Sequence, residues 1–131
     1  MRSREALIRL KRFQINEQRR KVAQVEGMIA EVQRMANVLE SEVRAEEERV
    51  GIHDPAHFAY PMLAKAAMQR RENLKQSAAK FNLQLGEVKA ALDEAVDDMQ
   101  KLELLDEREQ TQERSRQMAS TPVGIAAKGG L

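Results

Sequence analysis

The chain has 131 residues, of which a third are charged and only 3% are aromatic, and it contains no cysteine. The lack of cysteine excludes disulfide bonds and thiolate metal sites, and it is compatible with a reducing cytoplasm. The 22 basic and 21 acidic residues leave a net charge of +1, so overall charge does not indicate a nucleic-acid-binding or membrane-binding protein. This composition favours long solvated helices with a thin core over a compact globular domain.

The first predicted element is a long helix over about residues 3–50, with Ser3 as its N-cap and Gly51 at its C-terminal end. Apolar residues recur every seven positions, and a second apolar series follows three residues behind the first. The first series is Ile8, Ile15, Val22, Ile29, Ala36, Val43 and Val50, and the second is Val25, Val32 and Leu39. This heptad spacing is typical of a coiled-coil helix.

The segment 51–61, GIHDPAHFAYP, interrupts the heptads and holds both histidines, the only tyrosine and two of the three prolines. Asp54 followed by Pro55 is typical of a helix start, and Pro61 cannot continue that helix, so we expect a one-turn helix at a hairpin tip. We expect Phe58 and Tyr60 either to pack on the end of the coil, which we favour because exposed aromatic rings are costly, or to contact a partner.

The two histidines of this segment, His53 and His57, have the spacing of two metal ligands on one helical face. A zinc site needs three or four ligands, and only Asp54 stands close in sequence. We therefore favour two solvated histidines at a turn, and we predict no metal site.

A second heptad helix is predicted over about residues 61–117, with Arg71 as a polar member of its apolar seam. Its two series are Ala67, Leu74, Phe81, Val88, Ala95 and Leu102, and Ala64, Ala78, Leu85, Leu92 and Met99. Residues 118–131 hold a proline and three glycines without a heptad, so we expect a disordered tail. No apolar run approaches the roughly 18 residues of a membrane span, so we expect no transmembrane segment.

The two seams match if the helices fold back on each other with facing residue numbers that add up to 110, which places Pro55 at the midpoint. This register sets the basic residues 2–21 beside the acidic residues 93–109, and the acidic residues 40–48 near Lys65, Arg70 and Arg71. The sequence therefore predicts an all-α fold in which residues 1–117 form a long antiparallel two-helix coiled-coil hairpin.

The predicted hairpin offers no nucleophile beside a base, no phosphate loop and no pocket with paired carboxylates, so we expect neither an enzyme nor a cofactor site. Exposed apolar residues are expected instead at the open end of the hairpin, outside the seam. These are Leu7, Leu10, Phe13, Leu104 and Leu105. They suit either a partner-binding surface or packing against another copy of the chain. The basic residues 2–21 could bind phosphates, but the facing acidic residues favour pairing within the chain.

Two stretches on either side of the tip, ALIRLKRFQINEQRRKVAQVE (6–26) and QKLELLDEREQ (100–110), resemble the flagellar export protein FliJ family, as does the tip DPAHFAYP. The resemblance covers roughly residues 1–117. It implies a stalk-like component of the flagellar type III export apparatus that promotes assembly and activity of the hexameric export ATPase. It also implies contact with the membrane export gate and with export chaperones, in the cytoplasm at the inner membrane.

Three functional hypotheses therefore stand side by side. The first is the export-ATPase stalk, a monomer when free, whose open end contacts the ATPase and whose residues Phe58 and Tyr60 mark a contact at the tip. The second is a homo-oligomeric coiled-coil scaffold. The third is a basic coil that binds nucleic acid or anionic lipid through residues 2–21, which neither the net charge nor the facing acidic block favours.

Overall fold

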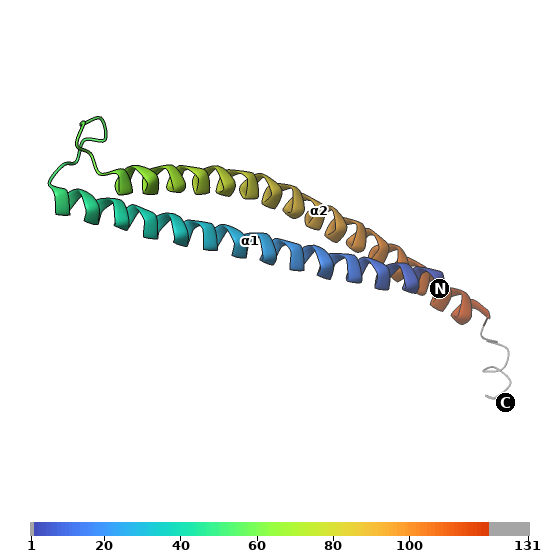
Figure 1. The fold of residues 1–131 in the computed structure, drawn as a ribbon. Helices are drawn as coiled ribbons and strands as arrows, with labels where there is room; N and C mark the ends of the chain where they lie inside the picture. Colours follow the sequence, from blue (N-terminus) through green and yellow to red (C-terminus); the bar gives the residue numbers. More distant parts are fainter. Residues whose placement is uncertain (1, 121–131) are drawn as a thin grey trace, which may run out of the picture. The chain divides into compact units, whose positions relative to one another are not determined.

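The computed structural model describes residues 2–120 and contains two helices, α1 (Arg2–Val50) and α2 (Met62–Ser120), joined by residues 51–61 (Figure 1). The described part of the chain has no strand. The predicted all-α helical hairpin is therefore confirmed. Neither helix, within the described range, has an apolar stretch long enough to cross a membrane.

The second helix ends later than the sequence suggested. Residues 118–120, which we expected in the disordered tail, form the last turn of α2. Met118 and Ala119 favour a helix, and the next residue that cannot continue one is Pro122. The rest of the predicted tail, residues 121–131, lies outside the described residues.

Gly51 ends α1 in the left-handed backbone region, with φ of 77°. Its N–H donates a 2.7 Å hydrogen bond to the carbonyl of Glu47. This arrangement caps one of the free carbonyls at the helix end and is available to glycine at no steric cost. The expected role of Gly51 as the stop of the first helix is confirmed.

The one-turn helix expected at Asp54 does not form. The segment makes two successive turns instead, in which His57 N–H donates to the Asp54 carbonyl and Tyr60 N–H donates to the His57 carbonyl, both at 3.0 Å. The Asp54 carboxylate accepts a bond from Ala56 N–H at 3.0 Å, which stabilises a turn locally. Pro61 has no N–H to offer the His57 carbonyl, so a helix could not have continued here.

The chain divides into a central unit, Glu17–Leu92, and a terminal unit, Met1–Asn16 with Asp93–Leu131, of which residues 2–16 and 93–120 are described. Each unit pairs part of α1 with part of α2, and each has ion pairs between the two helices. The central unit has Glu40 with Arg71, and the terminal unit has Lys11 with Asp98 and Arg4 with Glu109. The residue numbers in each pair add up to within three of 110, so the predicted antiparallel register holds in both units.

The buried side chains follow the predicted seam, with one exception. The terminal unit buries Ile8, Ile15, Ala95 and Met99, and the central unit buries Val25, Ile29, Val43, Tyr60, Ala64 and Ala67. All except Tyr60 belong to the heptad series. No polar or charged residue among those described is buried, so the core is the thin apolar strip that the composition predicted.

Candidate functional site

The histidines near the turn do not form a metal centre in the described chain. His53 Nδ1 lies 3.6 Å from Glu47 Oε1, and His57 Nδ1 accepts a 3.0 Å hydrogen bond from Ala59 N–H. The His57 ring stacks on Phe58 with centroids 4.7 Å apart. Nowhere in residues 2–120 do three or more histidine, cysteine or acidic side chains come close enough to hold a metal ion.

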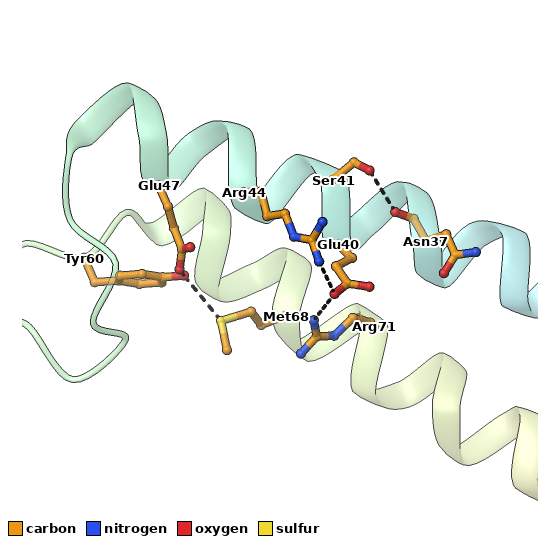
Figure 2. A network of polar contacts seen from close by, with 8 residues as sticks. All are labelled: Asn37, Glu40, Ser41, Arg44, Glu47, Tyr60, Met68 and Arg71. Carbon is orange, nitrogen blue, oxygen red and sulfur yellow. Dashed lines mark hydrogen bonds and ion pairs between the residues drawn. The ribbon is translucent and has the colours of Figure 1, made fainter.

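Tyr60 is a structural residue of the central unit. Its side chain packs with Val43, Ala64 and Ala67, and only 5% of it is exposed. Its hydroxyl donates a 2.6 Å hydrogen bond to Glu47 (Figure 2), which together with burial and the nearby negative charge raises the pKa of Tyr60 to about 12. The packing that we favoured for Tyr60 is present, so this ring is not free to meet a partner.

Phe58 has the opposite environment. Its side chain is 96% exposed, so the packing expected for this ring is absent and Phe58 remains the available aromatic residue of the segment. Two residues that the sequence analysis did not single out, Met62 and Leu63 at the start of α2, are 80% and 69% exposed. Their exposure could have been predicted from the sequence, because both positions lie outside the heptad seam. Exposed apolar side chains close together in sequence are typical of contact surfaces.

The five residues predicted at the open end all lie in the terminal unit and are all exposed. Their exposed fractions are 49% for Leu7, 51% for Leu10, 62% for Phe13, 54% for Leu104 and 44% for Leu105. Exposure alone does not make them a single face, because each residue advances about 100° around a helix. Leu104 and Leu105 are consecutive and diverge by that angle, whereas Leu7, Leu10 and Phe13 are spaced by three and follow one another around α1 as neighbours.

The charged side chains of the terminal unit are partly neutralised by each other. Arg4 lies 2.9 Å from Glu109, and Lys11 lies 3.3 Å from Asp98. These contacts place two members of the basic block 2–21 beside the acidic block, as the register predicted. A phosphate ligand would have to compete with these carboxylates for the same cations.

A second polar network lies in the central unit (Figure 2). The Glu40 carboxylate accepts a 3.0 Å hydrogen bond from Arg44 on its own helix, and Arg71 of α2 approaches it to 4.0 Å. Beside it, the Ser41 hydroxyl donates to the Asn37 carbonyl at 3.2 Å. Arg71, the polar member of the seam, thus reaches a carboxylate on the other helix. Of the three basic residues predicted to meet the acidic run 40–48, Arg71 makes such a pair.

Taken together, the described residues offer contact surfaces and ion pairs. The exposed apolar residues of the terminal unit, and Phe58 with its neighbours in the central unit, are the candidate partner-binding sites. No family model, curated protein or solved structure matches this chain.

Proposed function

We propose that this protein is a non-enzymatic component of the flagellar type III protein export apparatus. In this role it binds the hexameric export ATPase as a shaft and escort, promotes its assembly and activity, and links it to the export gate and to export chaperones. It would act in the cytoplasm, at the cytoplasmic face of the inner membrane, in flagellum biogenesis and motility.

The observation that carries this proposal is the set of large apolar side chains that the terminal unit leaves exposed. Leu7, Leu10 and Phe13 follow one another along α1, each about half exposed or more. Exposed apolar residues on a thin helical hairpin are suited to insertion into a partner. The resemblance of residues 6–26 and 100–110 to the FliJ family supplies the identity of that partner.

The experiment measures hexamer formation and ATP turnover of the cognate export ATPase with increasing amounts of the full chain. We expect both to rise. Leu10→Ala and Phe13→Ala should each weaken the effect on the order of 10-fold, as for a central interface residue. Leu83→Ala is the matched control, because Leu83 is 72% exposed but lies in the central unit. No stimulation at saturating protein would reject the proposal, and an effect equal for all three variants would reject the contact surface.

The second candidate is a homo-oligomeric coiled-coil scaffold, which the same exposed leucines would also suit. Sedimentation equilibrium separates the two functions. A stable dimer or tetramer that Leu10→Ala dissociates would favour the scaffold. A monomer at all concentrations would favour the export stalk.

A further inference from the structure

A groove runs between the two helices of the central unit, lined by residues 34–39 of α1 and 70–77 of α2. Its apolar lining consists of Met35, Val38, Leu39 and Leu74. Met35 and Val38 are 42% and 48% exposed, and the two leucines are half-buried. These side chains lie on the open side of the heptad seam, where the two-helix packing leaves them uncovered.

The charged residues that line this groove are all basic. Arg34 stands on the α1 side and Arg70 on the α2 side, and no acidic residue joins them in the lining. Arg34 donates a 2.5 Å hydrogen bond to Glu31 on its own helix, whereas Arg70 has no ion pair or hydrogen bond within the described chain. Because Glu31 already compensates Arg34, the groove carries one positive charge, that of Arg70, without a carboxylate partner among the described residues.

We propose that this groove binds an amphipathic helix of another protein whose apolar face is flanked by acidic residues. A third helix fits between two antiparallel helices because side chains on its apolar stripe enter the channel between them. The lining residues 70–77 span about two turns of α2, and the apolar part from Met35 to Leu39 spans about one turn of α1, which suits neighbouring anchors spaced i, i+3 or i+4. Met35 adapts readily to different partner side chains.

The charges select this occupant over a second copy of the chain. Carboxylates on the edges of the bound helix would meet Arg34 and Arg70, and arginine forms strong hydrogen bonds with carboxylates. A symmetric dimer through this groove would instead bring together two linings that contain no acidic residue, so Arg70 of neither copy would gain a carboxylate. The inference concerns the central unit alone and does not depend on the proposed function.

The test uses two synthetic amphipathic peptides with identical leucine stripes, one flanked by glutamates and the other by lysines. Fluorescence anisotropy measures their binding to the full chain. We expect the glutamate peptide to bind at least about 10-fold more tightly than the lysine peptide, and Val38→Gln to weaken it by about 10-fold. Arg70→Glu should weaken the glutamate peptide and strengthen the lysine peptide. Leu83→Gln changes a more exposed apolar residue outside the groove, 72% exposed against 48% for Val38, and should alter the affinity of neither peptide.

Several outcomes would overturn the proposal. These are equal affinity for both peptides, no effect of Val38→Gln, and no binding of the glutamate peptide up to about 1 mM, the limit of weak association. A dimer that Val38→Gln dissociates, without peptide binding, would assign the groove to a second copy. Circular dichroism checks the helicity of each variant, and Met35→Gln replaces Val38→Gln if that variant unfolds. No export ATPase enters this test, so its failure is distinct from failure of the proposed function.

Discussion

Tyr60 of the central unit and Phe13 of the terminal unit have opposite environments. Tyr60 in the central unit is 5% exposed and completes the core around Val43, whereas Phe13 in the terminal unit is 62% exposed. Both units pair the same two helices through the same heptad register. The difference lies in what is added to the seam. The central unit recruits a residue from the connecting segment, and the terminal unit leaves its aromatic residue exposed.

Truncation of both rings tests this difference between Tyr60 and Phe13 most strongly. Tyr60→Ala should lower the free energy of unfolding by about 3 kcal/mol, because it removes a buried ring and leaves a cavity. Phe13→Ala should change it by less than about 0.5 kcal/mol, because the ring is already in water. Urea unfolding followed by circular dichroism measures both. Similar losses for the two variants would show that Phe13 also stabilises the fold.

A second prediction isolates the hydroxyl of Tyr60. Tyr60→Phe keeps the ring and removes the bond to Glu47, so we expect a loss of about 1 to 2 kcal/mol at neutral pH. The same hydrogen bond should also make the free energy of unfolding depend on pH. An unfolded tyrosine has a pKa near 10, and Tyr60 in the folded chain has a pKa of about 12.

Between these two pH values the unfolded chain has lost the Tyr60 proton while the folded chain still holds it. The contribution of Tyr60 to stability is therefore complete below about pH 10 and is lost as the pH rises towards 12. The gap in unfolding free energy between the natural chain and Tyr60→Phe should narrow over this window. A constant gap from pH 9 to pH 12 would show that the hydroxyl does not retain its proton in the folded state.

The helices and their register were predictable because heptad spacing and charge blocks are properties of the sequence itself. Ile8, Ile29 and Ala95 are buried where the seam placed them, and Lys11 meets the acidic block as expected. The conformation of residues 51–61 was not predictable in the same way. It depends on a few local hydrogen bonds and not on a repeat, so the burial of Tyr60 could be favoured but not separated from that of Phe58.

The candidate partner-binding surfaces also differ in how far the sequence alone predicts them. Leu10 and Phe13 could be found from the sequence, because an apolar residue outside the seam is expected to be exposed. Met35 and Val38 satisfy the same criterion. Met35 and Val38 line a groove, however, only because Leu74 lies across from them on the other helix. Such a surface is composed of residues far apart in the chain, and it follows only once the side chains of both helices are placed.

The smallest predicted effect is the difference in coupling energy between an interhelical ion pair of the terminal unit and one of the central unit. Lys11 lies 3.3 Å from Asp98, and Arg71 lies 4.0 Å from Glu40, which also accepts a bond from Arg44. All are partly exposed, so each coupling should be below about 1 kcal/mol and should shrink in salt.

Double-mutant cycles with Lys11→Met and Asp98→Asn, and with Arg71→Met and Glu40→Gln, measure the two couplings in urea. The terminal pair should show the larger value, about 0.5 kcal/mol, because its contact is shorter and Asp98 has no second cation among residues 2–120. Removing Arg71 leaves Glu40 bonded to Arg44, so that cycle should give about half as much or less. The reverse order would mean that the central unit owes its pairing to charge as well as to Tyr60.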